Sequence, residues 1–528
     1  MRPLQSTQVH MPTATLLPAS PLTSVDSYSK IEPSPWSRIL QSAVSFPAML
    51  GAFLVAAVFV VTGRTFIVDP DFWWHIKVGD DILTSRHWPT TDSYSFTVAG
   101  HVWIAYEWLA EVMWAVVHRV GGLQGMNALQ VVLGSAIILA LYYFVSFRTG
   151  NSKAGFVATA ILFPLTCVSF SLRPQMVGYF FLIFTLIAME RFRQGKVRAA
   201  WFLPAVFLVW VNSHGSFIIG LGVVFLYWIA GWKEFRFGDI EGHVWSASQR
   251  IQLGFICLLC LAVLPITPYG TQLAVYPFDM AFSQPVNVAN IMEWQPMPFN
   301  LPGGKIFLAV VLTFLILQIA FRFTWRVEEL ALLLFGMTMA CLHVRFVLLF
   351  VPFFAPLLTI MLARWVPGYD RAKDRFVLNG FIMAALLTAI LIYFPSQTYL
   401  KQTLAKKYPF AALDYLKQHT VPGPMFNSYG FGGYLVYTGH KVFIDGRGDV
   451  YEHGGVLSDY GHIAKIEPNA LAVLRSYGIR SCMLLPDEPL TTLLAASPDW
   501  YQVFRDEATV IFVRTETVSR LSESSNRK

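Results

Sequence analysis

Residues 68–83, VDPDFWWHIKVGDDIL, follow directly on a long apolar run near 43–63. Two carboxylates one residue apart, Asp69 and Asp71, therefore stand where the chain leaves a hydrophobic segment, and two tryptophans and His75 come soon after. An apolar run of about 20 residues is long enough to cross a bilayer as a helix. The interpretation of the fold and of the chemistry thus depends on which side of a membrane this stretch faces.

The composition indicates a membrane protein. Of the 528 residues, 55% are hydrophobic and only 13% are charged, whereas soluble proteins have about 25% charged residues. The formal net charge of +7 comes from lysines and arginines scattered over short connections between apolar runs. Membrane proteins fix their orientation by this distribution, so we expect no nucleic-acid partner.

Eleven apolar segments are predicted to form transmembrane helices. Residues 1–42 are rich in Pro, Ser and Thr and lack the apolar core of a signal peptide, which predicts a disordered cytoplasmic tail. A multispanning transmembrane domain over 43–395 follows, with a large first outward loop at 64–125, and the chain closes with a C-terminal domain over 396–528. The apolar segments lie near 43–63, 126–147, 154–170, 175–190, 199–212, 216–231, 251–266, 306–323, 328–342, 346–363 and 376–395.

The lysines and arginines predict the orientation of these segments. If the N-terminus is cytoplasmic, every second connection is rich in Lys and Arg, as expected for cytoplasmic loops. The first loop and the C-terminal domain then lie outside. The centres of the spans hold almost no ionisable residues, which disfavours a transporter, because a transporter binds its substrate near the midplane. The polar residues of functional type gather at outer helix ends: Asp69, Asp71, His75, Glu107, Arg173, His214, Glu293, His343 and Arg345.

The pair Asp69 and Asp71 suits either of two chemical roles. In an extended turn their side chains point to the same side, and Pro70 between them limits how far they can separate. Two carboxylates so placed could bind a divalent cation such as Mg²⁺ or Mn²⁺. Alternatively, one of them could accept a proton from an attacking hydroxyl. The non-catalytic alternative is a membrane-surface helix whose tryptophans belong to an aromatic belt.

The stretch DPDFWWHIKVGDDILTSRHWPTTDSYSFTVAGHVWIAYEWLAEV at 69–112, with LRPQ, NSHGSF, HVRF and FNSYGFGGYLVYTGHKVFIDGRGDVY further on, resembles bacterial GT-C-type membrane glycosyltransferases and their uncharacterised relatives. The resemblance covers most of the chain beyond the first forty or so residues. It implies an all-α polytopic membrane protein with about 11 transmembrane helices and a small extracytoplasmic α/β domain at the C-terminus.

The same resemblance implies an activity. Such an enzyme transfers a sugar, usually with inversion, from a polyprenyl-phosphate donor to a glycan, lipid or protein acceptor on the outer face of the bacterial cytoplasmic membrane. Membrane lipid surrounds it. The acidic motif of the family carries over to Asp69 and Asp71, although Asp-Pro-Asp replaces the Asp-Glu pair common in the lipid A and protein-mannosyl branches. The alternative is a non-enzymatic membrane protein whose outer domain binds a partner or a glycan.

Other polar residues at helix ends could bind the substrate. Arginine suits a phosphate group because of its forked donors, so Arg173 and Arg345 are candidates for stabilising the leaving phosphate. The alternative for each arginine is contact with lipid head groups. His75, His214 and His343 could add hydrogen bonds, or could simply be satisfied polar groups at the interface. Glu107 could face either the site or water.

The segment after residue 395 is predicted to alternate helices and strands, as in a small α/β domain. Helical periodicity covers 408–419 and 468–477. In IDGRGD, Asp445, Arg447 and Asp449 come just after a predicted strand, where α/β sheets often bind ligands, but we favour the interpretation of this stretch as a tight glycine turn. The strand-like runs are GYLVYT at 433–438, KVFIDG at 441–446, SCMLLP at 481–486 and TVIFVR at 509–514.

Overall fold

The computed structural model describes residues 35–63, 69–167 and 170–515. The chain divides into two units, Met1–Ala43 and Val44–Lys528. Of the predicted disordered tail, residues 1–34 lie outside the described part, and Pro35–Ala43 form helix α1. Residues 64–68 of the first predicted loop also lie outside it.

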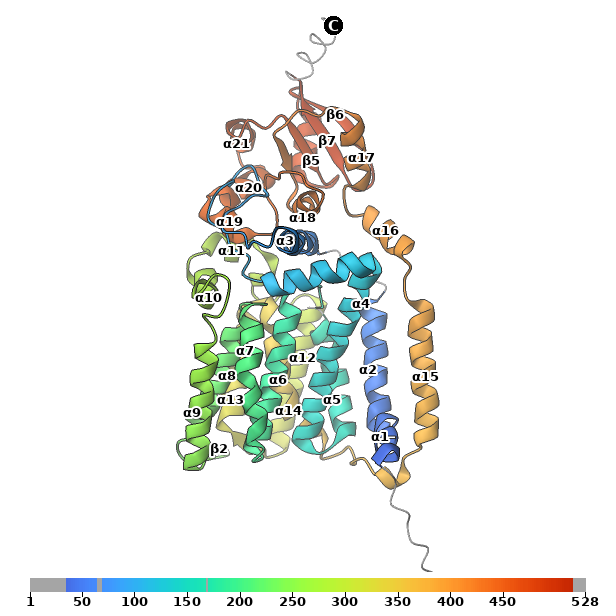
Figure 1. Ribbon diagram of the computed structural model, residues 1–528, viewed down its shortest axis with the longest axis vertical. Helices are drawn as coiled ribbons and strands as arrows, with labels where there is room; N and C mark the ends of the chain where they lie inside the picture. Colours follow the sequence, from blue (N-terminus) through green and yellow to red (C-terminus); the bar gives the residue numbers. More distant parts are fainter. Residues whose placement is uncertain (1–34, 64–68, 168–169, 516–528) are drawn as a thin grey trace, which may run out of the picture. The chain divides into compact units, whose positions relative to one another are not determined.

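Every one of the eleven apolar segments predicted from the sequence contains an apolar helix. In the second unit these helices run alongside one another in a bundle (Figure 1). A 3-10 turn, η1 (Val197–Phe202), precedes α7. The helices are α2 (Phe46–Thr62), α4 (Trp108–Thr149), α5 (Ser152–Cys167), α6 (Gln175–Arg193), α7 (Leu203–Val211), α8 (Phe217–Ala230), α9 (Ala247–Ala262), α12 (Pro302–Ala320), α13 (Val327–Leu342), α14 (Val347–Leu362) and α15 (Phe376–Tyr393).

Five helices in the described ranges are by themselves long and apolar enough to cross a bilayer: α4, α6, α12, α14 together with the 3-10 turn η3 (Val344–Phe346) before it, and α15. The others are shorter, with 9 to 17 residues. The prediction of a polytopic, mainly helical membrane protein is therefore confirmed, and the number of eleven spans stays a prediction. A small sheet, β1 (Phe235–Phe237), β2 (Ile240–Gly242) and β3 (Trp325–Arg326), joins connections of the bundle, and η4 (Arg371–Lys373) precedes α15.

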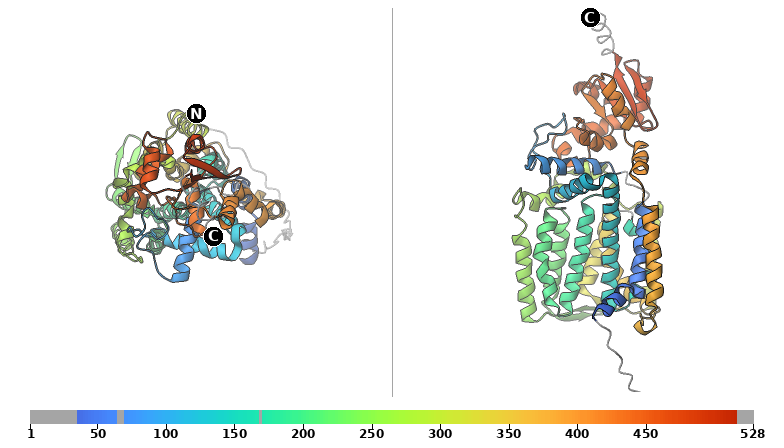
Figure 2. Two further views of the ribbon diagram at one scale, coloured as in Figure 1. Left: turned by 90° about the horizontal axis from the view of Figure 1, so that it is seen from above. Right: turned by 45° about the vertical axis from the view of Figure 1, so that its right-hand side comes forward.

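The first predicted loop contains two helices that lie across one end of the bundle (Figures 1 and 2). One is α3 (Asp71–Ser85), and the other is the first part of α4, which changes direction at Gly122 (φ 53°, ψ −145°). This backbone conformation is readily adopted only by glycine. Trp73 and Trp74 of α3 are each only 3% exposed. The interpretation of these tryptophans as an aromatic belt is therefore wrong, because they pack inside the protein.

The C-terminal part is a small α/β domain, as predicted. Its sheet has the order β4-β5-β7-β6, with β4 parallel to β5 and the other pairs antiparallel. The strands are β4 (Met425–Asn427), β5 (Ser481–Leu484), β6 (Trp500–Arg505) and β7 (Val510–Arg514). The helices are α16 (Gln397–Ala405), α17 (Phe410–Gln418), α18 (Tyr429–Tyr437), α19 (Gly448–His453), α20 (Val456–Ala464), α21 (Ala470–Ser476) and α22 (Pro489–Ala496).

Two of the four predicted strands are wrong. The strands predicted at 481–486 and 509–514 correspond to β5 and β7, and the predicted helical stretches to α17 and α21. GYLVYT, however, belongs to helix α18, and KVFIDG is irregular, with a single bridge from Val442 to Ser95. A short apolar run that is buried all round has no periodicity by which a strand can be told from a helix.

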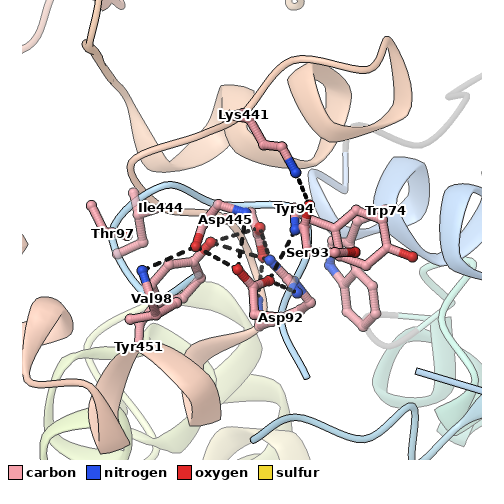
Figure 3. A network of polar contacts seen from close by, with 12 residues as sticks. Trp74, Asp92, Ser93, Tyr94, Thr97, Val98, Lys441, Ile444, Asp445 and Tyr451 are labelled. Carbon is pink, nitrogen blue, oxygen red and sulfur yellow. Dashed lines mark hydrogen bonds and ion pairs between the residues drawn. The ribbon is translucent and has the colours of Figure 1, made fainter. Parts of the chain in front are cut away.

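A buried ionic network joins the C-terminal domain to the first loop. Arg447 is 1% exposed and donates to Asp92 Oδ1 at 2.6 Å and to Asp445 Oδ2 at 2.6 Å. Figure 3 shows the two carboxylates facing each other, with Tyr451 beside them. Tyr451 donates its hydroxyl hydrogen to Asp445 Oδ2 at 2.8 Å. The guanidinium also lies over the ring of Trp103, 4.7 Å from its centroid.

Candidate active site

A cavity of about 900 Å³ lies where the bundle, the first loop and the C-terminal domain meet. Two short elements of the connection between α9 and α12, α10 (Gln272–Phe282) and α11 (Pro285–Asn290), and the 3-10 turn η2 (Met292–Trp294) form part of its wall. Asp69, one of the eight site residues predicted from the sequence, is outside the lining. The other seven line the cavity: Asp71, His75, Glu107, Arg173, His214, His343 and Arg345.

The start of α3, a backbone hydrogen bond and close packing fix the conformation of the Asp-Pro-Asp turn. Pro70 is the N-cap residue of α3, and Asp71 lies in its first turn, where a carboxylate interacts favourably with the helix dipole. Asp69 Oδ1 accepts a hydrogen bond from the backbone N of Asp71 at 3.0 Å. The C-terminal domain packs directly on this turn, since a Cβ atom on Gly446 would lie 1.6 Å from Asp71 Oδ1. Only a glycine leaves room for the carboxylate there.

One guanidinium holds three carboxylates. Arg173, just before α6, places Nε 2.6 Å from Asp69 Oδ2, Nη2 2.9 Å from Asp71 Oδ2 and Nη1 2.8 Å from Glu293 Oε1. Burial raises the pKa of Asp71 to about 7; Arg173 opposes this shift, whereas the charges of Asp69 and Glu293 add to it. The cluster has more carboxylates than cations, so a proton on Asp71 is easily held near neutral pH.

The expected divalent cation does not fit between Asp69 and Asp71 in this arrangement. The guanidinium of Arg173 contacts an oxygen of each carboxylate and so takes the position of a shared metal ion. Within the described ranges, no three His, Cys, Asp or Glu side chains form a cluster that could hold a metal. Arg173 is the cation that contacts both carboxylates in this structure.

A second group of titratable residues surrounds Glu107, which precedes α4. Glu107 Oε2 is 3.8 Å from His75 Nε2, and Glu107 Oε1 is 3.5 Å from His214 Nε2. His75 Nδ1 also contacts Glu111 Oε1 at 3.1 Å. Burial raises the pKa of Glu107 to about 8. It lowers the pKa of His75 well below its ordinary value and that of His214 to about 3. At neutral pH we therefore expect Glu107 to be protonated and both imidazoles to be neutral.

Arg345 differs from Arg173 in its partners. Its guanidinium lies over the ring of Trp294, 4.3 Å from the centroid, and none of the described carboxylates comes within 4 Å of its nitrogens. His343 is oriented by a 2.5 Å contact between its Nδ1 and the carbonyl oxygen of Trp294. Arg345 is thus a cation in the cavity wall that is available to an anionic ligand.

The remaining wall of the cavity is largely apolar. It is formed by the beginning of α8, by α13 and by the beginning of α14, all of them helices of the bundle. A ligand with an anionic head and a hydrocarbon tail would match both kinds of surface. The apolar lining residues are Ile218, Ile219, Phe335, Met339 and Leu349 from these helices and Phe346 from η3.

Sequence reasoning missed part of this site. Asp449, Gly446 and Gly448 line the cavity, although the sequence favours a glycine turn over a ligand site for IDGRGD. The available signal was the alternation of glycine with Asp445, Arg447 and Asp449. Asn287 also lines the cavity, and nothing in its sequence context marks it.

No protein-family model matches the chain, and no curated protein matches it in sequence. Among solved structures it is similar to the oligosaccharyltransferase of Archaeoglobus fulgidus, with 12% identity, a TM-score of 0.48, and coverage of 84% of this chain and 69% of that one. It is also similar to ArnT from Cupriavidus metallidurans bound to undecaprenyl phosphate (14%, TM-score 0.47, 90% and 97%). A third is the mycobacterial arabinofuranosyltransferase AftD (14%, TM-score 0.48, 88% and 41%). With TM-scores below 0.5, these similarities transfer neither activity nor ligand to this chain.

Proposed function

We propose that this protein is a membrane glycosyltransferase that moves a sugar from a polyprenyl-phosphate donor to an acceptor hydroxyl at the outer face of the membrane. The observation that carries the proposal is the two-sided cavity. One part of its wall has carboxylates and Arg345, which pairs with none of the described carboxylates, and another part is apolar and belongs to the bundle. A sugar linked to a lipid through phosphate has the same two parts, a polar, charged head and a hydrocarbon tail. The sequence resemblance to GT-C-type glycosyltransferases points to the same reaction.

In this mechanism Arg345 binds the phosphate, and the prenyl chain lies against the apolar wall. The acceptor oxygen attacks the anomeric carbon from the side opposite the phosphate, so the configuration is inverted. The bond from the anomeric carbon to the phosphate oxygen breaks, and its electron pair leaves with polyprenyl phosphate. The proton of the acceptor hydroxyl passes to Asp71. A base is most effective when its pKa lies near the working pH, and the pKa of Asp71 is about 7.

The other polar residues support this step. Arg173 and Asp69 fix the orientation of the Asp71 carboxylate and act as positioning residues. The charge that develops on the leaving phosphate is stabilised by the fixed cation of Arg345, an effect that is strong where water is excluded. Protonated Glu107 can donate a hydrogen bond without adding negative charge beside the phosphate.

The direct test uses the purified full-length protein and polyprenyl-phosphate sugars that carry a labelled sugar. An envelope extract of the source organism supplies the acceptor. We expect release of polyprenyl phosphate and movement of label into the extract. Binding of the lipid without any turnover would contradict the proposal and favour the non-enzymatic alternative.

Replacing Arg345 with Ala should weaken the binding of polyprenyl phosphate about 10- to 100-fold. A hydrogen bond to a charged group contributes about 1.5–3 kcal/mol, and about 1.4 kcal/mol corresponds to a factor of ten. Arg345→Lys should lose less, since it keeps the charge but not the forked geometry. The measurement is a titration of the protein with undecaprenyl phosphate.

Arg364 provides the matched control for this experiment. It follows the other end of α14 and also lies near an aromatic ring, 5.7 Å from the centroid of Phe321. Arg364→Ala should change the dissociation constant less than twofold. Equal losses in the two alanine variants would contradict a phosphate site at Arg345.

Glu107→Gln should transfer sugar at about the wild-type rate at pH 7. Its rate should not show the fall at alkaline pH that we expect of the wild type. Below pH 8 the wild-type side chain is protonated, and Gln is likewise a neutral donor. As the pH rises through about 8, Glu107 becomes a buried anion, and wild-type transfer should fall. The titratable groups that face it are Asp71, His75, Tyr106, Glu111, Arg173, His214, Tyr276, Arg345 and Asp449.

The measurement is the transfer rate between pH 6 and pH 9.5. Glu467→Gln serves as the control, because Glu467 forms an exposed pair with His462 at 3.5 Å and should leave the profile unchanged. An alkaline limb that persists in Glu107→Gln would assign the limb to another group.

A further inference from the structure

Two histidines of the cavity wall are held by backbone groups in opposite ways. His214 lies between α7 and α8, His343 lies between α13 and η3, and both line the cavity. A neutral imidazole carries its hydrogen on one ring nitrogen, which donates, while the other nitrogen accepts. The partner of one nitrogen therefore decides what the other nitrogen offers to a ligand.

His214 is fixed as a donor. Its Nδ1 accepts from the backbone N–H of Ser216 at 3.1 Å, because an N–H group can only donate. Ser216 Oγ lies 2.8 Å from the same nitrogen. This hydroxyl accepts from Trp210 Nε1 at 3.0 Å, so its own hydrogen is directed to Nδ1. With two donors on Nδ1, the hydrogen of the neutral ring is on Nε2.

Close packing holds this arrangement in place. Gly178 of α6 lies against it, since a Cβ atom on Gly178 would be 2.2 Å from Ser216 Oγ. The same atom would be 3.2 Å from both His214 Nδ1 and Trp210 Nε1. The edge of the imidazole that carries Nδ1 is therefore enclosed, and the edge that carries Nε2 is left for the cavity.

The Nε2 hydrogen of His214 is available to a ligand. Glu107 Oε1 lies 3.5 Å from Nε2, farther than the about 2.7–3.2 Å of a hydrogen bond from N–H to oxygen. The His214 side chain is 15% exposed. Burial lowers its pKa, and the nearby charge of Arg345 adds to this shift. A phosphate bound to Arg345 would thus lie near a second, uncharged donor.

His343 is fixed as an acceptor. Its Nδ1 contacts the carbonyl oxygen of Trp294 at 2.5 Å, and a carbonyl can only accept, so Nδ1 carries the hydrogen. In the neutral ring Nε2 then has a lone pair, which finds no hydrogen-bond donor among the described residues. The ring of Trp294 also lies against the guanidinium of Arg345. One residue therefore places this acceptor beside the cation.

A sugar phosphate has a matching group for each of these nitrogens. The oxygens of an ionised phosphate accept hydrogen bonds, whereas the hydroxyl groups of a sugar also donate them. A phosphate oxygen therefore matches the N–H group of His214, and a hydroxyl group matches the lone pair of His343. The reverse placement would set the lone pair of His343 against an anionic oxygen. The two histidines thus fix which part of the head group each of them contacts.

We propose that His214 donates a hydrogen bond from Nε2 to the phosphate of the donor lipid, and that His343 accepts one at Nε2 from a hydroxyl group of its sugar. This rests on the proposed glycosyltransferase function and adds to it the atoms that distinguish the two parts of the donor's head group.

The experiment measures the binding of two kinds of lipid to the purified full-length protein. One is undecaprenyl phosphate, and the other is undecaprenyl phosphate carrying mannose, glucose or arabinofuranose. We expect His214→Asn to weaken the binding of both kinds about tenfold. His343→Asn should weaken at least one sugar-bearing lipid by the same factor and leave undecaprenyl phosphate within twofold of wild type.

Glutamine variants show whether the loss belongs to Nε2. The amide of Asn occupies about the position of Nδ1, whereas that of Gln reaches about the position of Nε2 and can donate or accept there. His214→Gln and His343→Gln should therefore recover most of the binding. His118→Asn is the matched control, because His118 packs on Tyr437 with the ring centroids 5.7 Å apart and is outside the cavity lining. It should bind both kinds of lipid like the wild type.

Nitrogen NMR spectra of the protein with isotope-labelled histidine test the two tautomers without any lipid. His214 should carry its hydrogen on Nε2 and His343 on Nδ1, with each signal assigned by its loss in the Asn variant. The opposite tautomer at either ring, the same effect of both Asn variants on the two kinds of lipid, or no effect of either would overturn this inference alone. A wild-type protein that binds neither kind of lipid would overturn the proposed function together with it.

Discussion

Asp71→Asn is expected to reduce sugar transfer by about 10²- to 10⁴-fold, the contribution typical of a general base. Asparagine has nearly the same shape and can still contact Arg173, but it cannot accept the proton of the acceptor hydroxyl. The measurement is the release of polyprenyl phosphate from a labelled donor under single-turnover conditions. Binding of undecaprenyl phosphate should remain within a few-fold of wild type.

Two further variants make this test specific. Asp80→Asn changes an acid of the same helix whose Oδ1 pairs with the exposed Arg119 at 2.6 Å, and it should keep full activity. Asp69→Asn should lose less than Asp71→Asn, because Asp69 contacts Arg173 without lining the cavity. A variant Asp71→Asn that keeps a tenth or more of the activity would refute Asp71 as the base.

Arg447→Met is expected to destabilise the C-terminal domain by about 3–5 kcal/mol, the cost of breaking a buried ion pair by removing one partner. The variant leaves Asp92 and Asp445 buried without their cation. For a domain of this size the midpoint of thermal unfolding should fall by roughly 10 °C. Trypsin should also cut the C-terminal part under conditions in which the wild type resists.

Arg475→Met is the matched control for this variant. Arg475 pairs with Asp499 at 3.2 Å, and both side chains are more than half exposed. Such surface pairs contribute about 0–1 kcal/mol, so the unfolding midpoint should hardly move. A wild-type midpoint in Arg447→Met would show that the buried network does not hold the domain in place.

The helical bundle is predictable from sequence for a simple reason. In lipid, backbone groups must find partners within the segment, so a long apolar run forms a helix. The strand predictions failed where this constraint does not apply. GYLVYT is buried on several sides as part of α18, where Gly432 and Gly433 allow close approach to the backbone at Ile444 and Pro70. That packing involves residues far away in the sequence, so local patterns do not reveal it.

The site residues also fall into those that the sequence reveals and those that it does not. Asp71, Arg173 and Arg345 were identifiable because charged residues at the ends of apolar segments, on one predicted side, are brought together by the topology. The place of Asn287 in the cavity wall and the burial of Arg447 were not. The burial of Arg447 depends on Asp92, 355 positions earlier, and the position of Asn287 depends on its bonds to Gln284 and Glu452.

The long separation between Asp92 and Arg447 has a consequence for biosynthesis. A chain is made from its N-terminus, so the first loop is translated long before its partner cation. Until residue 447 has been synthesised, Asp92 has no Arg447 to pair with, and Gly446 cannot close over the Asp-Pro-Asp turn. The proposed transfer activity is therefore expected to begin only when the segment around residue 447 docks on the first loop.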